Sequence, residues 1–578
     1  MPRMFRVTLS LLLCLLAAPA FAQEGPVHDK PLSEAPRAQA VTAKNGMVVA
    51  QEALAAQIGV DILKAGGNAV DAAVATGFAM AVTYPRAGNI GGGGFMVIHL
   101  AKPRKNIAID YREMAPSAIG KDSFLDEAGN ADPQKSLKSG LGVGVPGTVA
   151  GLSLAHRKYG SGKFTLAQLL APAIALARDG FIVTGDLADT LVAAKPLFER
   201  WPSSVKVMLK PDGSSYGEGD RLVQADLANT LQAIATQGPK GFYEGAVAEK
   251  IAAAVREAGG VMTADDLRTY RVKERKPVTG TYRGYRIISM PPPSSGGTHL
   301  IEMLNMLEAY DLKKTGPSSA ETAHLMIEAM RRAYADRAVY LGDPDFVRVP
   351  VRGLISKSYA RMIGKSIGER ATPSSEIRNG DPVAAEGDNT THFSVVDRYG
   401  NAVANTYTLN LSYGNGLIAD GTGVLLNNEL DDFSAKPGAP NAFGLVGASA
   451  NAPAPRKRPL SSMTPTIVMK DGKPHLVTGS PGGSRIITTV LQIIVNVLDH
   501  GMNVADAVSS PRIHHQWLPD EVFAEKTYPD DVLKGLEERG HRIATRVQNT
   551  SANSILITKD GFSGAADTRT RGAVAVGY

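Results

Sequence analysis

A short stretch at residues 386–397 places the strongest constraint on what this chain can fold into. Its left half, through Asn389, is small and polar like a loop, whereas its right half alternates in the manner of a β-strand. Thr390 lies at the junction. If the chain were cut before Thr390, the freed α-amine, with a pKa of about 8, could take the proton of the threonine hydroxyl. The alternative is an ordinary strand start, because threonine is common in strands.

The residues that follow predict a hairpin. Residues 393–397 and 402–408 are strand-like, and the turn-forming residues 398–401 lie between them. Antiparallel pairing places Leu409 opposite Thr390 and Thr408 opposite Thr391, give or take one residue. We therefore expect the Thr408 hydroxyl to lie within reach of Thr390, where it can orient that side chain.

Composition is that of a folded protein with no nucleic-acid partner. Of the 578 residues, 44% are hydrophobic and 20% are charged, enough for one or two large cores. The formal charge of +6 is spread along the chain, and the densest basic run, 456–458, is too short to indicate nucleic-acid binding.

Residues 1–22 have the pattern of a secretory signal. Arg3 and Arg6 precede an apolar run at 9–18, and a small-x-small motif predicts cleavage after Ala22. The apolar run is shorter than the roughly 20 residues of a membrane-spanning helix, which argues against the alternative of a membrane anchor. The only cysteine, Cys14, lies in this segment, so no disulfide is expected in the mature chain. We expect export to the periplasm and no membrane partner.

Helix and strand patterns occur in both halves of the chain and predict a layered α/β body. The four glycines at 91–94 are interpreted as close backbone packing, because no phosphate-loop signature follows them. Residues 371–389 are polar and expected to be mobile. Helices are expected at 51–63, 69–82, 319–337 (amphipathic) and 486–498. One hairpin is expected to pair the strands 464–470 and 475–478, and a last hairpin to begin with the strand 554–558.

Five strings of sequence carry a family resemblance. They are residues 110–116, 390–392, 426–434, 458–463 and 479–485. Together, and in this order, they closely resemble the γ-glutamyltranspeptidases of the N-terminal nucleophile hydrolase superfamily. The resemblance extends from about residue 47 to residue 578.

The resemblance implies an α/β fold, a four-layer αββα sandwich shared by two subunits cut from one precursor. The cut would fall between Asn389 and Thr390, giving a large subunit, 23–389, and a small catalytic subunit, 390–578, that form a heterodimer. The implied activity is that of a γ-glutamyltransferase and glutathione hydrolase without a cofactor. A γ-glutamyl ester would form on the enzyme and pass to water or to the amine of an amino acid or dipeptide.

The resemblance also implies a role for each candidate residue. Thr390 is the nucleophile, Thr408 orients it, and the backbone N–H groups of Gly482 and Gly483 form the oxyanion hole. Arg112, Ser461 and Ser462 bind the substrate α-carboxylate. Asn410, Glu429 and Asp432 bind its α-ammonium. Taken singly, each of these polar residues could equally be an ion pair, a helix cap or a turn residue.

One position departs from part of the family. Residues 437–447 resemble a lid loop, and its aromatic position holds Phe443, where enteric bacterial relatives carry tyrosine. Phenylalanine can cover the pocket but cannot donate a hydroxyl hydrogen bond to Asn410. We therefore expect a looser gate and an altered balance between hydrolysis and transfer.

Two other functions are compatible with parts of the sequence. A glutaryl acylase of the cephalosporin type would not need the ammonium partners. A periplasmic glutathione-binding protein would need the charged residues but neither Thr390 nor the two glycines. His514 and His515 have no third ligand at suitable spacing, so no metal site is predicted there.

Overall fold

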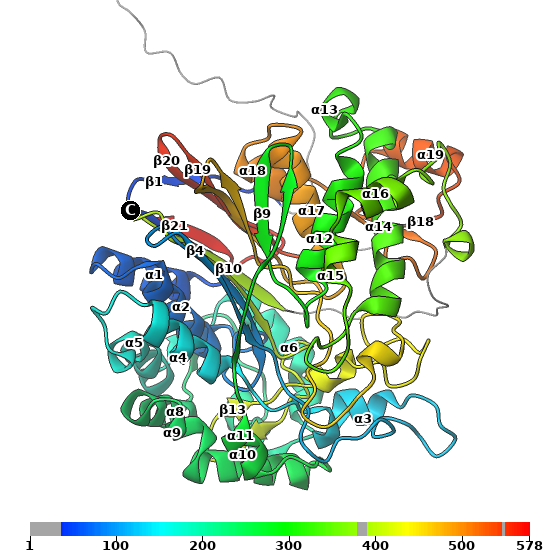
Figure 1. The fold of residues 1–578 in the computed structure, drawn as a ribbon. Coiled ribbons are helices and arrows are strands. Elements are labelled where there is room, and N and C mark those ends of the chain that lie inside the picture. Colours follow the sequence, from blue (N-terminus) through cyan, green and yellow to red (C-terminus); the bar gives the residue numbers. More distant parts are fainter. Residues whose placement is uncertain (1–35, 378–389, 546–549) are drawn as a thin grey trace, which may run out of the picture.

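The computed structural model describes residues 36–377, 390–545 and 550–578. The predicted signal 1–22, residue Asn389 and most of the polar segment 371–389 lie outside these ranges. The described residues form two antiparallel sheets packed face to face, with helices on both outer sides (Figure 1).

Each of the two sheets has seven strands. The first sheet has the order β21 (Val574–Gly577), β2 (Gly46–Ala50), β10 (Thr391–Asp397), β11 (Ala402–Thr408), β3 (Gly93–Leu100), β4 (Lys105–Tyr111) and β7 (Lys273–Arg275). The second has the order β1 (Val41–Ala43), β20 (Gly561–Ala566), β19 (Asn553–Thr558), β15 (Lys473–Thr478), β14 (Thr466–Lys470), β9 (Tyr285–Ser289) and β8 (Val278–Tyr282). Each sheet thus combines strands from both halves of the chain.

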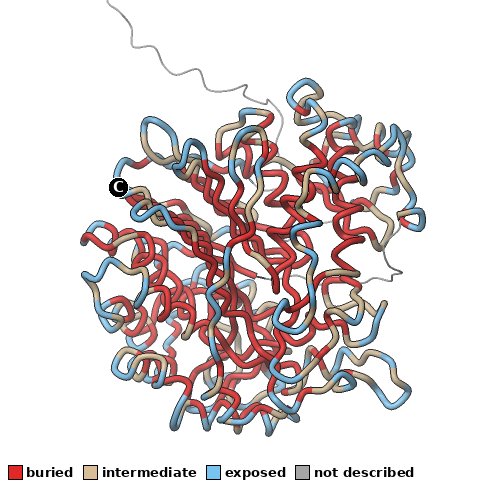
Figure 2. Tube along the Cα trace, viewed as in Figure 1, coloured by how far each residue is buried: buried red, intermediate tan, exposed pale blue. Residues whose placement is uncertain are grey.

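Three apolar layers hold this body together. Figure 2 shows that the central strands are buried along their length. Side chains such as Phe95, Ile288 and Ile467 fill the space between the sheets. The first sheet packs on a helical layer that includes α1 (Ala53–Lys64), α2 (Ala69–Thr83), α4 (Thr148–Tyr159), α5 (Leu166–Asp179), α8 (Ala225–Gln237) and α10 (Gly245–Glu257). The second packs on a layer that includes α12 (Gly296–Leu307), α14 (Ala320–Tyr340), α17 (Arg485–Leu498) and α18 (Val504–Ser509). The arrangement is the predicted αββα sandwich.

The predicted helices form close to their expected bounds, with caps that the sequence encodes. Helix α2 begins at a reciprocal capping box, in which the Asn68 side chain accepts from the Asp71 N–H and the Asp71 side chain accepts from the Asn68 N–H. Every residue of α2 is buried, as its apolar composition predicted.

Helix α14 differs from the prediction. Its sequence predicted one apolar face, but the helix is enclosed nearly all round from Thr322 to Ala338. Charged residues are therefore buried, and Arg332 illustrates how they are accommodated, because it ion-pairs with Glu328 one turn earlier at 2.6 Å. Periodicity could not show this, because pairing between charges replaces exposure to water.

The hairpin of β10 and β11 forms as predicted, with its register shifted by one residue. Thr391 pairs with Tyr407, so Thr390 lies across from Thr408 rather than from Leu409. This shift is within the expected tolerance, and it brings the two threonines closer than the predicted pairing did.

The four glycines at 91–94 serve backbone packing, as predicted. A Cβ atom on Gly92 would lie 2.1 Å from the Thr408 carbonyl oxygen, and one on Gly91 would lie 2.0 Å from the Leu425 carbonyl oxygen. Only glycine permits these approaches. The run therefore lets neighbouring backbone pack closely around the end of β11.

No helix within the described residues is both long and apolar enough to cross a membrane.

Candidate active site

Thr390 lies immediately before β10, at the end of the central hairpin, and is 7% exposed. Its Oγ1 lies 3.5 Å from Oγ1 of Thr408. The Thr408 hydroxyl accepts a hydrogen bond from the Asn410 N–H at 2.9 Å, and the Thr408 carbonyl accepts one from the Asn89 amide at 2.8 Å. Thr408 is thus fixed by its surroundings, and it places a hydroxyl oxygen beside Thr390.

A small cavity of about 20 Å³ adjoins Thr390, room for roughly one water molecule. It brings together nearly all of the predicted site residues. The lining residues are Arg112, Thr390, Thr408, Asn410, Glu429, Asp432, Phe443, Ser461, Ser462, Met463, Gly483 and Ile486. Of the candidate catalytic and substrate-binding residues, only Gly482 is outside this lining.

Arg112 is the centre of a buried charge cluster. Its guanidinium forms ion pairs with Glu429 and Asp432, and Glu113 lies 3.8 Å away. Burial alone would lower the pKa of Arg112, but the surrounding carboxylates raise it, so the side chain stays charged. The predicted carboxylate-binding arginine and two of the three predicted ammonium partners are therefore ion-paired with one another in this structure.

Glu113 is a member of this cluster to which the sequence assigned no role. Burial raises its pKa to about 7, and neither of its carboxyl oxygens has a hydrogen-bond partner among the described residues. Burial also raises the pKa of Glu429 well above its ordinary value and raises that of Asp432. In the sequence, the only sign that Glu113 belongs to this cluster was its position next to Arg112 in the 110–116 string.

Asn410 and Glu429 each present an unused acceptor. The Asn410 amide donates to the Asn428 carbonyl at 2.9 Å, while its Oδ1 is buried and has no partner within the described chain. The same holds for Oε2 of Glu429. Buried acceptors without donors are costly, so this side of the cavity is suited to a ligand that brings N–H groups.

The backbone around Ser461 and Ser462 is held by the start of α12. The Ser461 carbonyl accepts from both the N–H and the hydroxyl of Ser295, each at 2.8 Å. The Ser462 hydroxyl accepts from Arg337 at 3.2 Å. Arg337 was not predicted from sequence, where it is only the last residue of the amphipathic helix expected at 319–337.

Gly482 and Gly483 form a turn at the N-terminus of α17, with φ of 127° and 52°. Their carbonyls face the helix and accept from Arg485 and Ile486 at 2.9 and 3.3 Å. Neither glycine N–H forms a hydrogen bond to another described residue. The helix dipole adds partial positive charge at this end, so the turn offers an environment that favours an anion.

The predicted lid, residues 437–447, is anchored to the charge cluster by Asn441. Its amide donates to Asp432 at 2.8 Å, and its Oδ1 accepts from the backbone of Phe443 and Leu445 at 3.0 and 3.1 Å. Phe443 is 5% exposed and lines the cavity. Asn441, like Glu113 and Arg337, is thus a residue that sequence reasoning did not single out.

The two consecutive histidines lie in separate hydrogen-bond networks. His514 contacts Thr488 and Gln516 at 2.9 and 3.0 Å. His515 accepts from the Trp517 N–H at 3.0 Å. Their ring nitrogens do not converge on one point.

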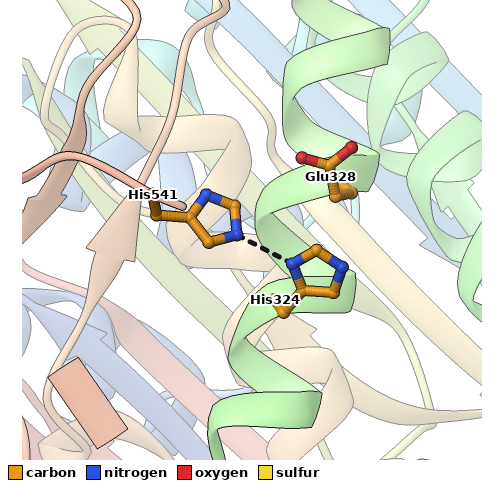
Figure 3. A group of neighbouring side chains, drawn as sticks. All are labelled: His324, Glu328 and His541. Carbon is orange, nitrogen blue, oxygen red and sulfur yellow. Dashed lines mark hydrogen bonds between the residues drawn. The ribbon is translucent and has the colours of Figure 1, made fainter. Parts of the chain in front are cut away.

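A different group, His324, Glu328 and His541, has potential ligand atoms within 4.8 Å of one another (Figure 3). His324 donates from Nε2 to the Gly368 carbonyl at 2.8 Å, so its Nδ1 accepts from His541 Nε2 at 2.7 Å. Glu328 is neutralised by Arg331 and Arg332. A metal would need lone pairs on both facing nitrogens, which this proton arrangement does not offer. We therefore interpret the cluster as a structural link between α14 and the segment before β18 (Ile543–Thr545).

Comparisons with known proteins show which family this chain resembles. Residues 55–577 match the family described as Gamma-glutamyltranspeptidase. The glutathione hydrolase proenzyme of Escherichia coli K12 is 54% identical over 540 residues, covering 93% of this chain and 93% of that protein. The crystal structure of a cephalosporin acylase from Bacillus halodurans is 30% identical with a TM-score of 0.83, covering 96% and 99% of the two chains. Helicobacter pylori gamma-glutamyltranspeptidase is 49% identical with a TM-score of 0.56, covering 61% of this chain and 97% of that chain.

Two facing antiparallel sheets enclosed by helices, with Thr390 at the head of a central strand, define the fold class of the N-terminal nucleophile hydrolases. Within this class, the chain belongs to the γ-glutamyltranspeptidase family. The predictions of fold class and family are thereby confirmed.

Proposed function

We propose that this protein is a γ-glutamyltransferase and glutathione hydrolase that matures by cutting itself before Thr390. The observation that carries this proposal is the convergence on one cavity of the Thr390 hydroxyl, the Arg112 charge cluster and Gly483. A nucleophile, an anion site and a zwitterion site are the parts needed to transfer an acyl group with an amino-acid head.

Maturation would begin with removal of residues 1–22 in the periplasm, and would continue with cleavage between Asn389 and Thr390. The large subunit, 23–389, and the small subunit, 390–578, would remain together as a heterodimer. Sheet pairing supports this expectation, because β10 and β11 of the small subunit pair with β2 and β3 of the large one. Cleavage exposes the Thr390 amine, which is an amide nitrogen in the precursor.

In the proposed reaction, the Thr390 amine takes the hydroxyl proton as Oγ1 attacks the γ-carbonyl of the substrate. The N–H groups of Gly482 and Gly483 stabilise the oxyanion that forms. The C–N bond then breaks, the leaving amine takes the proton from the Thr390 ammonium, and a γ-glutamyl ester remains. Water hydrolyses this ester to glutamate, or an amino acid or dipeptide amine takes the glutamyl group. Thr408 orients the nucleophile throughout.

Recognition of the glutamyl head would exchange one set of ion pairs for another. The α-carboxylate would bind Arg112, Ser461 and Ser462, and the α-ammonium would bind Asn410, Glu429 and Asp432. The unused acceptors on Asn410 and Glu429 support the ammonium site. A cavity of about 20 Å³ is too small for a glutamyl group, so binding requires the side chains that line it to rearrange.

Glutaryl acylase activity is the second candidate, and the structural similarity to the Bacillus halodurans acylase favours it. A glutaryl group has the carboxylate but lacks the α-ammonium, so it could draw Arg112 away from Glu429 and Asp432 without supplying a cation to replace it. The complete acidic set therefore favours the γ-glutamyl substrate. A glutathione-binding protein would have no use for Thr390 beside the anion-favouring turn.

Intact mass and N-terminal sequencing of the purified protein test the proposed maturation. We expect two chains, the smaller beginning Thr390-Thr391-His392. A single chain that stays uncut on long incubation would contradict the proposal. Turnover of γ-glutamyl and glutaryl p-nitroanilides by the same preparation then separates the two enzyme functions, and glutathione hydrolysis identifies the natural class of donor.

A further inference from the structure

Arg337 lies in the last turn of α14 and is 5% exposed. Its Nε donates to the Ser295 hydroxyl at 2.9 Å, and its Nη2 donates to the Ser462 hydroxyl at 3.2 Å. No carboxylate of a described residue lies within ion-pair distance, 4.0 Å, of this guanidinium. Arg337 is thus a buried cation bonded only to hydroxyl groups.

Other buried arginines of this region are neutralised. Arg112 pairs with Glu429 and Asp432, and Arg332 pairs with Glu328. Asp432 attracts Arg337 electrostatically, but its two oxygens are already bonded to Arg112 and Asn441. Burial lowers the pKa of Arg337 to about 10, so the side chain is still charged at neutral pH. A buried charge without a counter-ion is destabilising, which indicates a role that offsets this cost.

Ser462 connects this charge to the cavity. Because its oxygen accepts from Arg337, its own proton is available to a second acceptor, and Ser462 lines the cavity beside Thr390. Ser295 makes a second connection, since it accepts from Arg337 and donates to the Ser461 carbonyl. One guanidinium therefore fixes both serines of the predicted carboxylate site.

We propose that Arg337 is a positioning and specificity residue that supplies the uncompensated positive charge for the substrate α-carboxylate and orients Ser462 to donate to it. This inference rests on the proposed function. Arg112 is neutralised by Glu429 and Asp432, so its charge alone gives little net attraction for an anion. Arg337 restores that attraction through its own charge and its hydrogen bond to Ser462, and does not itself contact the substrate.

The test compares two anilides that differ in a single group. γ-Glutamyl p-nitroanilide carries the α-carboxylate, and 4-aminobutyryl p-nitroanilide lacks it but retains the amine. For Arg337→Met we expect KM for the γ-glutamyl compound to rise about 10- to 100-fold, the range expected for hydrogen bonds to a charged group, with kcat changed less than about 3-fold. The kcat/KM for the 4-aminobutyryl compound should change less than about 2-fold. If its turnover is too slow to measure, its inhibition constant against the γ-glutamyl compound gives the same comparison.

Three further variants separate charge from structure. Arg337→Lys keeps the charge but replaces the separate Nε and Nη2 donors with a single nitrogen, so it should retain part of the selectivity that Arg337→Met loses. Ser295→Ala leaves the arginine in place and should raise KM by a smaller factor. Arg332→Met removes a paired arginine of the same helix and should lower Tm without changing the ratio of the two substrates. The lysine and Ser295 variants decide the question if Arg337→Met does not fold.

The possible failures are distinguishable. A wild-type enzyme that does not hydrolyse the γ-glutamyl anilide would refute the proposed function itself. The role of Arg337 alone would be overturned by a different result: wild type is active, the Arg337 variants lose kcat/KM equally for both anilides, and Arg337→Lys does no better than Arg337→Met.

Discussion

The ring of Phe443 lies directly against Gly483. A Cβ atom added to Gly483 would lie 2.4 Å from Cδ1 of Phe443, far closer than two carbon atoms approach without a bond. The lid and the turn that begins α17 are therefore packed without any space between them. A larger residue at position 483 is thus disfavoured for two reasons: its side chain would collide with Phe443, and the backbone has a φ of 52°, which favours glycine.

Gly483→Ala should reduce kcat by about 100-fold, the loss seen when an oxyanion donor is removed in other enzymes. The added methyl group displaces Phe443 and strains the backbone that carries the Gly483 N–H. Gly472→Ala is the matched control, because Gly472 also has a positive φ, 77°, but nothing lies within 4 Å of its Cβ position. The control should lose about 1 kcal/mol of stability and no activity. Equal kcat in the two variants would show that Gly483 has no catalytic part.

Phe443→Tyr should shift the balance from hydrolysis toward transfer. Phe443 and Asn410 line the same cavity, and Asn410 Oδ1 has no donor within the described chain, so a tyrosine hydroxyl has an acceptor available. The added bond would hold the lid closed over the ester for longer and restrict water. The ratio of transfer to hydrolysis, measured with glycylglycine as acceptor, should rise about 3- to 10-fold for a bond of about 1 kcal/mol. An unchanged ratio would refute the expected looser gate.

Thr390→Ala should remain a single chain, because no hydroxyl is left to attack the preceding peptide bond. Thr391→Val is the matched control, since the Thr391 hydroxyl is buried and has no partner among the described residues. The control should still mature into two chains. Denaturing gel electrophoresis and intact mass distinguish these outcomes. Cleavage of Thr390→Ala, or failure of both variants to mature, would contradict the assignment of Thr390 as the residue that attacks the preceding peptide bond.

Thr408→Ala should lower kcat by about 10-fold and leave KM within about 2-fold. Its hydroxyl is positioned by the Asn410 N–H and lies 3.5 Å from that of Thr390, so it acts on the nucleophile more than on binding. The loss corresponds to one hydrogen bond of about 1.4 kcal/mol. Thr408→Ser, which keeps the hydroxyl, should recover most of the rate. A serine variant as slow as alanine would point to packing by the methyl group instead.

Glu113→Gln should change the pH dependence of stability. Burial raises the pKa of Glu113 from 4.5 to about 7 in the folded protein, so folding favours its protonated form. This contribution is present below pH 4.5 and is lost as pH rises through about 7. Glutamine resembles the protonated acid, so wild type and variant should have similar Tm at pH 5, while the variant should be more stable at pH 8.5 by a few degrees. Parallel Tm curves across this range would contradict the assignment.

Local signals in the sequence were sufficient for most of the fold. The apolar residues of α2 and its Asn68 cap, the turn at 471–472 and the alternation after Thr390 are each encoded within a few residues. The hairpin register was predicted only to within one residue, because a turn fixes the approximate pairing but not the final hydrogen bonds. The amphipathic prediction for α14 was wrong, since its charges are buried through pairing and hydroxyl contacts that no periodicity shows.

The sequence alone determined that Thr390 stands where a loop meets a strand, that Thr408 lies near it, and which family motifs surround them. Only the tertiary structure decided that Arg112 is neutralised by Glu429 and Asp432, that Phe443 rests on Gly483, and that Arg337 reaches Ser462 from 125 positions away in the chain. The physical reason is the range of the interactions. Caps, turns and strand alternation act between near neighbours, whereas burial and electrostatics depend on which distant segments share a low-dielectric space.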